Sequence, residues 1–247
     1  MRMLLPETVD PLDEGGLAAA YPWPDGPWLR ANMVTSVDGV AAGPDGRSGS
    51  ISGPADRLVL RTLRADADVV LVGAGTVRSE RYRAPRRVAG VAERRVAAGR
   101  APTHRIAVVT RSAELDPSLP FLADADPAAR PLVLTCASAD AGRRARLAEV
   151  GEVVEVGDDT VDLTAALAAL HSRSLPRVLT EGGPSLLRDL VEAGLLDELD
   201  VTISPVLVGG RDSIRMLGGA ALTDAPEPWR PVHLLEDDGF LFRRLLR

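Results

Sequence analysis

The chain has 247 residues, of which 45% are hydrophobic and 26% are charged, and its formal net charge is −6. This size and apolar content allow a substantial core and favour one large α/β domain with a short N-terminal extension. The negative balance argues against general attraction to nucleic acid or to membranes, so an anionic ligand must meet a local basic site. All 29 basic residues are arginine, which excludes a lysine-dependent phosphate loop and a Schiff-base lysine.

Cysteine and histidine usage argues against a disulfide or a metal centre. The single cysteine, Cys136, ends an apolar run, which is typical of a buried structural thiol. His104, His171 and His233 stand far apart without acidic or cysteine neighbours at ligand spacing. The N-terminus lacks the basic-then-apolar pattern of a signal peptide, and no apolar run reaches membrane-spanning length. We therefore expect a cytoplasmic protein with no metal and no membrane association.

Residues 1–27 contain five prolines and several acidic residues, which predicts an irregular arm. Trp23 and Trp28 suggest that this arm docks onto the domain or onto a partner subunit. Residues 28–247 are expected to form a single domain.

From residue 28 onward, strand and helix patterns alternate. The first strand is expected over residues 28–35, followed by a loop with an Asp38-Gly39 turn and by a helix that begins at Ser52-Gly53-Pro54 and ends near Ala67. Further strands are expected at residues 68–72, 106–110, 131–135, 153–156 and 177–180, and helices at 140–149, 161–172 and 184–193. Continuous apolar strands of this kind are typical of a parallel sheet covered on both faces.

The C-terminal part has a different pattern. A long strand is expected over residues 200–208, and two strands within 232–247 are joined at Asp237-Asp238-Gly239, as in a hairpin. The sequence therefore predicts an α/β fold with a mostly parallel sheet and an antiparallel C-terminal edge. Ligands of such sheets bind at the carboxyl ends of the strands.

Two glycine-rich strand-to-helix junctions stand out, and we interpret them as parts of one split phosphate site. The first contains Gly73, Gly75 and Thr76. Glycine lets the backbone approach an anion, and the N–H groups of a following helix point toward it. Arg78 stands where the third glycine of the dinucleotide fingerprint belongs, which argues against an ordinary Rossmann site.

The second junction is Glu181-Gly182-Gly183-Pro184-Ser185. Proline at the first helical position donates no hydrogen bond, so an anion would contact the amides of Gly183, Ser185 and Leu186. Glu181 directly follows a buried strand. Its carboxylate either contacts polar groups of a ligand or braces the loop.

Residues 78–105 contain nine arginines and one aromatic residue, Tyr82. Without a base-stacking platform this stretch does not resemble a nucleic-acid site. We expect most of these charges to form a solvated face, with one or two arginines holding a phosphate. Arg64 could serve in the same way or form a surface ion pair.

Several short motifs, in this order and spacing, resemble the reductase domain of the riboflavin-biosynthesis deaminase/reductase family across nearly the whole chain beyond residue 28. They are Ala31-Asn32-Met33-Val34-Thr35-Ser36-Val37-Asp38-Gly39, Ile51-Ser52-Gly53, Leu63-Arg64-Ala65, Leu71-Val72-Gly73-Ala74-Gly75-Thr76-Val77, Thr180-Glu181-Gly182-Gly183-Pro184-Ser185-Leu186, Asp197-Glu198-Leu199 and Ser204-Pro205.

The resemblance implies a dihydrofolate-reductase-like three-layer fold, homodimerisation, and NADPH-dependent reduction of the ribosyl group of a pyrimidine ribosylamino phosphate to ribityl. By position it implies cofactor contacts at Val34, Gly73, Gly75, Thr76, Glu80, Arg111, Ser112, Gly182, Gly183, Pro184, Ser185, Leu186 and Leu187, with Arg111 and Ser112 facing the adenosine 2′-phosphate. It implies substrate contacts at Asn32, Ser48, Arg64, Arg87 and Glu181. Asp38, Glu181 or water would donate the proton, and Asp38 could instead only shape its turn.

The chain departs from the family pattern at Asn32, where the family often has a basic residue, and at Glu80, which replaces a usual aspartate. The zinc ligands of the deaminase half are missing, so we expect no deamination. Two alternatives therefore stay open. One is a dihydrofolate or pterin reductase of the same fold, and the other is a nucleotide or sugar-phosphate binding module without turnover.

Overall fold

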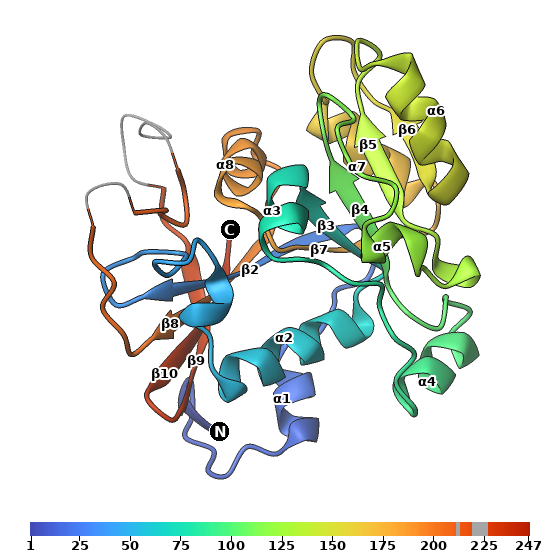
Figure 1. Ribbon diagram of the computed structural model, residues 1–247. Coiled ribbons are helices and arrows are strands. Elements are labelled where there is room, and N and C mark those ends of the chain that lie inside the picture. Colours follow the sequence, from blue (N-terminus) through green and yellow to red (C-terminus); the bar gives the residue numbers. More distant parts are fainter. Residues whose placement is uncertain (211–212, 219–226) are drawn as a thin grey trace. The chain divides into compact units, whose positions relative to one another are not determined.

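The computed structural model describes residues 1–210, 213–218 and 227–247. It contains two compact units, which are described separately (Figure 1). Unit 1 comprises Met1–Arg64 and Thr180–Arg247, and unit 2 comprises Ala65–Leu179. The dividing points fall inside a helix and a strand, so the chain enters and leaves unit 2 within regular secondary structure.

In its described residues, unit 1 contains five strands in the order β1-β9-β10-β8-β2. β2 and β8 run parallel, whereas β1, β9 and β10 pair in antiparallel fashion. Helix α2 begins in this unit and ends two residues beyond it. The elements are β1 (Arg2–Leu5), α1 (Glu14–Ala20), β2 (Trp28–Ser36), η1 (Ser48–Ser50), α2 (Pro54–Asp66), α8 (Pro184–Glu192), β8 (Glu198–Ser204), β9 (Arg230–Asp237) and β10 (Phe240–Leu246).

Unit 2 contains the strands β7-β3-β4-β5-β6 in that order, and β3 to β6 are parallel. The central residues of its strands β3, β4 and β5 are Val, Leu, Ile and Ala with almost no exposed surface, as expected for a sheet covered on both faces. The elements are β3 (Val69–Gly73), α3 (Ala74–Ser79), α4 (Val91–Ala97), β4 (Arg105–Val109), α5 (Pro120–Ala123), η2 (Pro127–Ala129), β5 (Leu132–Thr135), α6 (Ala141–Val150), β6 (Glu152–Glu155), α7 (Leu163–His171) and β7 (Arg177–Thr180).

Local sequence signals explain where several helices begin. Asp140 and Asp162 precede α6 and α7, and each side chain accepts a hydrogen bond from the backbone N–H three residues later. Pro184 opens α8, where its missing N–H costs nothing. The amphipathic faces of α2 and α8 bury leucines and a valine, including Val59, Leu63 and Leu187.

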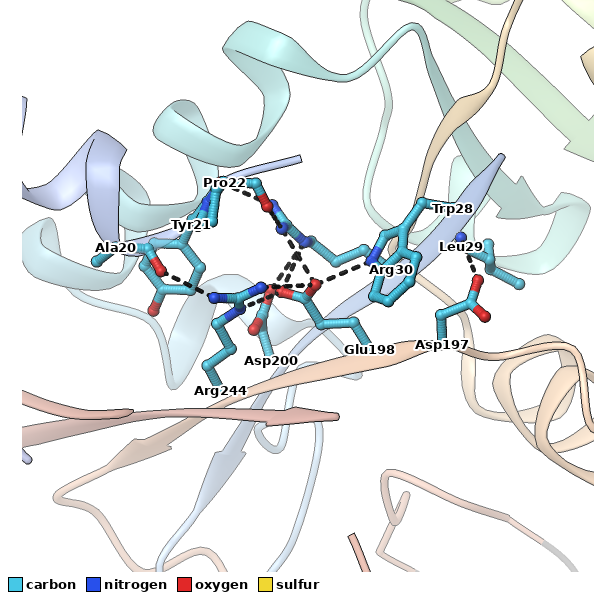
Figure 2. A network of polar contacts seen from close by, with 10 residues as sticks. All are labelled: Ala20, Tyr21, Pro22, Trp28, Leu29, Arg30, Asp197, Glu198, Asp200 and Arg244. Atoms are coloured by element: carbon cyan, nitrogen blue, oxygen red, sulfur yellow. Dashed lines mark hydrogen bonds and ion pairs between the residues drawn. The ribbon is translucent and has the colours of Figure 1, made fainter. Parts of the chain in front are cut away.

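One face of β8 is buried and polar. Glu198, Asp200, Thr202 and Ser204 alternate along the strand and are all nearly inaccessible to solvent. Because side chains alternate across a strand, these four share one face of the sheet. That face carries the ion cluster in Figure 2, where Glu198 lies between two arginines.

The two arginines of this cluster connect the N-terminal segment to the sheet of unit 1. Arg30 donates to the backbone oxygens of Tyr21 and Pro22, and Arg244 donates to the oxygen of Ala20. The Arg30 guanidinium also lies 4.3 Å from the centroid of the Trp23 ring. Trp23 of the N-terminal segment thus contacts a buried charge of unit 1, as the predicted docking of this segment requires.

Most elements expected from residue 28 onward are confirmed to within a few residues, including the C-terminal hairpin of β9 and β10. The prediction of an irregular arm over residues 1–27 is wrong in part, because this segment contains β1, which pairs with β9, and helix α1. The expected strand over residues 200–208 ends earlier, at Ser204. The single domain over residues 28–247 stays a prediction.

The arginine-rich stretch contains a helix that the sequence did not predict. Helix α4 includes Arg95, whose side chain is buried and donates to the backbone oxygens of Ala65, Ala67 and Ala101. These carbonyls supply the acceptors that a buried guanidinium requires. The expectation of a mostly solvated face therefore fails at this residue.

Among the described residues, no helix is long and apolar enough to cross a lipid bilayer.

Candidate active site

The first glycine junction lies at the carboxyl end of β3 in unit 2. Gly73 pairs in register with Val109 of β4, so the ends of these two strands are neighbours. Gly73 forms the N-cap of α3, a six-residue helix that contains Gly75 and Thr76. A Cβ atom added to Gly75 would meet nothing within 4 Å. The backbone at Gly75 is therefore open to close approach by a ligand.

A short loop after β4 carries Arg111 and Ser112, both exposed. Ala113 follows with a φ of 50° and a fully buried side chain. A non-glycine residue keeps this left-handed conformation only where its surroundings enforce it. The amide of Glu114 donates to Ser112 Oγ at 3.3 Å, and the oxygen of Arg111 accepts a hydrogen bond from Cys136 Sγ. The buried thiol predicted at Cys136 thus supports this loop.

In unit 1, Asp38 follows the end of β2. Its carboxylate accepts hydrogen bonds from Ser36 Oγ at 2.7 Å and from the amides of Val208 and Gly209 at 3.1 and 2.8 Å. These bonds, with the Ser36 hydroxyl contributing most, lower the pKa of Asp38 to about 2. The side chain is ionised at neutral pH and joins two segments of unit 1, which favours the turn-shaping role over proton donation.

Arg64 and Glu181 form a bidentate ion pair in unit 1. Arg64 Nε and Nη2 each donate to a different Glu181 oxygen at 2.6 Å. The Glu181 side chain is only 7% exposed and that of Arg64 is 33% exposed. Helix α2 supplies the arginine and the residue after β7 supplies the carboxylate. Two predicted substrate residues, 117 positions apart, are therefore in contact.

The second glycine junction opens α8. Gly182 has a φ of +77°, and a Cβ there would lie 3.2 Å from Met33 Sδ. The Gly182 N–H already donates to Thr180 Oγ1 at 3.2 Å, so this hydrogen bond stabilises the loop itself. Gly183 is the N-cap and offers no side-chain acceptor to the first helical turn. The amides of Ser185 and Leu186, in the first turn, have no acceptor within the helix and suit an anion.

The other predicted residues of unit 1 lie on β2 and after it. Asn32 pairs in register with Asp200, is 9% exposed, and its Oδ1 accepts no hydrogen bond from the described residues. Val34 is half-buried and pairs with Thr202. Ser48 begins η1 and is half-buried.

Two predicted residues of unit 2 form contacts within that unit. Glu80 forms the C-cap of α3, where its amide donates to the oxygen of Thr76. Arg87 forms a bidentate ion pair with Asp126, at 2.6 and 3.1 Å, and its side chain is 61% exposed. Among the described residues, Arg87 therefore contacts a carboxylate of its own unit, and its role toward a substrate stays a prediction.

Sequence reasoning missed two arginines that touch the Arg111 loop. Arg78 Nη1 donates to the oxygen of Glu114 at 3.1 Å, and Arg143 Nη1 donates to the oxygen of Ser112 at 3.3 Å. Arg143 stands in the first turn of α6, directly after β5 and its loop. Its position after a strand end was the available signal, but nothing in the sequence distinguished it from its arginine neighbours.

Within the described part of the chain, no group of three or more His, Cys, Asp or Glu side chains could hold a metal ion.

The strands, their carboxyl ends and the arginine and amide donors there define an α/β protein with anion-binding potential at the ligand edge of its strands. The chain belongs to the RibD C-terminal domain family, whose model matches residues 27–238.

Named relatives agree with this membership. A 2,5-diamino-6-ribosylamino-4(3H)-pyrimidinone 5′-phosphate reductase from Archaeoglobus fulgidus is 30% identical over 193 residues, covering 78% of this chain and 87% of the relative. A reductase of the same name from Methanothermobacter thermautotrophicus is 31% identical over 204 residues, covering 83% and 89%.

Among solved structures, a pyrimidine reductase-like protein from Corynebacterium diphtheriae superposes with a TM-score of 0.81 at 29% identity, covering 89% of this chain and 91% of that one. The family and the fold class predicted from the sequence are both confirmed.

Proposed function

We propose that this protein reduces the ribosyl group of a pyrimidine ribosylamino phosphate to a ribityl group with NADPH. Membership of the RibD C-terminal domain family and the names of its relatives support a reductase of this pathway. The observation that carries the proposal is the Arg64–Glu181 pair, a polar group held in place beside the glycine junction that opens α8.

The Arg64–Glu181 pair suits a sugar phosphate substrate. Carboxylate oxygens accept hydrogen bonds from hydroxyl and ring N–H groups, and the two bonds from Arg64 fix the orientation of the Glu181 carboxylate. The Arg64 guanidinium is one-third exposed, and a planar guanidinium group suits the oxygens of a phosphate. Because two hydrogen bonds fix the geometry of the pair, it can orient a ligand. Asn32 and Ser48 are proposed as further substrate contacts in this unit, and Arg87 in unit 2.

The residues present fit a nicotinamide dinucleotide phosphate. Gly75 leaves space where a Cβ would stand, and the first-turn amides of α8 have no helical acceptor. NADPH, when bound, supplies the hydride. The remaining contacts proposed from the family resemblance are Val34, Gly73, Thr76, Glu80, Arg111, Ser112, Gly182, Pro184 and Leu187.

The reaction also needs a proton, and we propose that water supplies it. Asp38 is ionised above about pH 2 and its oxygens are occupied by three donors. Glu181 accepts two short charge-assisted hydrogen bonds from Arg64, a geometry that favours the carboxylate form. Neither group therefore suits a proton donor. Glu181 instead acts by holding the substrate.

The test is spectrophotometric oxidation of NADPH by the purified full chain. A diaminopyrimidinone ribosylamino phosphate, an aminouracil ribosylamino phosphate and dihydrofolate are offered in turn. Turnover with either pyrimidine supports the proposal. Turnover with dihydrofolate alone, or with none of the three, overturns it in favour of the pterin reductase or of the non-catalytic binding module.

A matched pair of variants tests the role of the ion pair. Glu181→Gln should lower kcat/KM for the pyrimidine at least about tenfold, because it removes a charge-assisted acceptor. Arg61→Met, on the exposed side of the same helix as Arg64, is the control and should leave kcat/KM unchanged. Equal effects of the two substitutions would contradict the assignment.

We also propose, from the family resemblance, that the protein is a cytoplasmic homodimer. Light scattering coupled to gel filtration measures the mass directly, and a mass near 26.1 kDa would contradict the dimer.

A further inference from the structure

The chain contains four Asp-Gly pairs, and each carries the chemistry for isomerisation of its backbone. In such a pair the amide nitrogen of the glycine can attack the carboxyl carbon of the aspartate side chain, because glycine has no Cβ atom to hinder the approach. The pairs are Asp25-Gly26, Asp38-Gly39, Asp45-Gly46 and Asp238-Gly239. Since all four share this local chemistry, their surroundings in the fold decide how fast each one reacts.

In three of the pairs the attacking nitrogen is already engaged. Its N–H group donates a hydrogen bond to an oxygen elsewhere in the turn, and this bond must break before the nitrogen can reach the carboxyl carbon. These bonds run from Gly39 to the oxygen of Ser36, from Gly46 to the oxygen of Gly43, and from Gly239 to Glu236 Oε1, at 2.9, 2.9 and 3.0 Å.

Two of the aspartates are also held by their carboxylates. Asp38 accepts from Ser36 Oγ and from two backbone amides, and Asp45 accepts from Ser50 Oγ and from one amide. The Ser36 hydroxyl is the largest cause that lowers the pKa of Asp38 to about 2, and the Ser50 hydroxyl likewise lowers the pKa of Asp45. Because the attack expels water from a protonated carboxyl group, a lowered pKa depletes the reactive form.

Asp25-Gly26 lacks all of these restraints. Both residues are exposed, and neither forms a hydrogen bond or an ion pair with any other residue that the structure describes. A Cβ atom built on Gly26 would meet nothing within 4 Å, so the aspartate side chain has open space in which to fold back onto the amide. In this pair alone of the four, both the attacking nitrogen and the carboxyl group are unengaged among the described residues.

We propose that Asp25 is a site of isoaspartate formation in the folded protein and that the fold protects the other three pairs. A C–N bond forms between Gly26 N and Asp25 Cγ, and the amide hydrogen leaves with the carboxyl hydroxyl group as water. Water then opens the cyclic imide at its α-carbonyl carbon, so that the main chain continues through Cβ and Cα carries the carboxylate. The first step releases the water that the second consumes, and the sequence needs no oxidant, reductant or cofactor. This inference does not depend on the proposed function.

The modified position lies between two contacts with the buried ion cluster of unit 1. The oxygen of Pro22 accepts from Arg30 Nη2 at 2.7 Å, and Trp28 Nε1 donates to Glu198 at 2.9 Å (Figure 2). Isoaspartate at residue 25 lengthens the main chain between these contacts by one methylene group, so at least one contact must shift. We therefore expect the isomerised chain to melt at a lower temperature than the fresh chain.

The first experiment ages the full chain in neutral buffer, once folded and once in urea. Peptide mapping with electron-transfer dissociation mass spectrometry then distinguishes isoaspartate from aspartate at each pair. In the folded chain we expect isoaspartate to accumulate at Asp25 at least about tenfold faster than at any of the other three, because those must first open a hydrogen-bonded turn. In urea the four pairs should react at comparable rates.

A matched pair of variants identifies the source of the isoaspartate. Asp25→Glu enlarges the ring that the attack must close, so it should remove most of the isoaspartate formed in the folded chain. Asp45→Glu, in an exposed pair whose amide and carboxylate are engaged, is the control and should leave the total unchanged. The total is measured by methylation with a protein L-isoaspartyl methyltransferase and labelled S-adenosylmethionine.

Three results would overturn the inference. One is isoaspartate at another pair of the folded chain at a rate equal to that at Asp25. Another is the same ranking of the four pairs in urea, which would assign the selectivity to local sequence instead of the fold. The third is an unchanged total in Asp25→Glu. Equal melting temperatures of the fresh and the largely isomerised chain would overturn the expected effect on the contacts of Pro22 and Trp28.

Discussion

At the scale of single residues, the carboxylate of Glu198 contacts three other side chains. It pairs with Arg30 Nε at 2.9 Å and with Arg244 Nε at 2.7 Å, and it accepts from Trp28 Nε1 at 2.9 Å (Figure 2). Its side chain is fully buried, as is that of Arg30. Two buried cations therefore share one carboxylate, and its loss would break both ion pairs.

Asp200 lies in the same cluster, and its surroundings favour the protonated form of its carboxyl group. Burial, and next the negative charge of Glu198, raise the pKa of Asp200 well above its ordinary value. Neither of its oxygens takes part in a hydrogen bond of ordinary geometry among the described residues, and Arg30 Nε is 3.5 Å away. Asp200 is therefore expected to be neutral in the folded protein.

An ionised Glu198 and a neutral Asp200 predict a large loss of stability for one substitution and a small change for the other. Glu198→Gln should lower the free energy of unfolding by about 3–5 kcal/mol, because it breaks a buried ion pair. Asp200→Asn should change it by less than about 1 kcal/mol, because it replaces a neutral group of the same shape. Urea unfolding at pH 7 measures both. Comparable losses would show that Asp200 is ionised.

His233 predicts a dependence of stability on pH. Burial, and next the charge of Arg244, lower its pKa from 6.5 to about 4, so the folded protein holds it neutral. Between pH 6.5 and 4 the unfolded chain binds the extra proton, so stability falls as the pH is lowered through this window. The free energy of unfolding is therefore higher above pH 6.5 than well below pH 4, by as much as about 3 kcal/mol.

The measurement is urea unfolding at a series of pH values. His233→Phe should flatten the slope between pH 6.5 and 4, whatever its effect on overall stability. An unchanged slope in His233→Phe would assign the pH dependence to other groups.

At the scale of elements, the carboxyl ends of β2 and β8 are joined by backbone and side-chain bonds. Val37 N donates to the oxygen of Val206, and Asp38 accepts from the amides of Val208 and Gly209. The exposed Leu207 lies between these contacts. Because a loop without a core depends on such bonds, Asp38 holds the segment that follows β8.

We predict that Asp38→Ala loosens this segment. Hydrogen exchange at the amides of Val208 and Gly209 should become faster, and proteolysis after Leu207 should increase. Asp45→Ala is the control, since the hydrogen bonds that Asp45 forms with described residues, to Ser50 and Arg47, stay within its own loop. Turnover retained within about tenfold would agree with a structural role, whereas its loss by several orders of magnitude would restore Asp38 as an acid.

The elements show which signals the sequence carries well. Val69, Val70 and Leu71 form a continuous buried run, and β3 lies where that pattern predicts it. Helix α4 was missed because its arginines suggested a solvated loop, while Arg95 turns inward to backbone carbonyls. A charged residue can be buried when remote carbonyls receive it, and no local pattern reports those carbonyls.

At the scale of the whole molecule, the cooperativity of unfolding tests the single domain expected over residues 28–247. All three tryptophans, Trp23, Trp28 and Trp229, belong to unit 1, so their fluorescence reports that unit. Far-UV circular dichroism reports both units. Since the division falls inside α2 and β7, we predict that the two signals change together in urea.

A destabilising change confined to unit 1 sharpens this test. Glu198→Gln should shift the fluorescence and circular dichroism midpoints by the same amount. Separate midpoints, or a dichroism transition that only partly moves, would show two independently folding units and contradict the single domain.

The sequence by itself determined the fold class, the order of most strands and helices, the glycine junctions and the family. Each of these depends on local periodicity or on short motifs, which neighbouring residues carry. It also identified Arg64 and Glu181 as candidate site residues.

Only the tertiary structure decided what the arginines do. Arg64 reaches Glu181 across 117 positions, Arg30 and Arg244 share Glu198, and Arg143 meets the loop after β4. Ion pairs and buried donors depend on distances between residues that are remote in the chain. In a protein whose basic residues are all arginine, composition cannot separate a structural guanidinium from one that awaits a ligand.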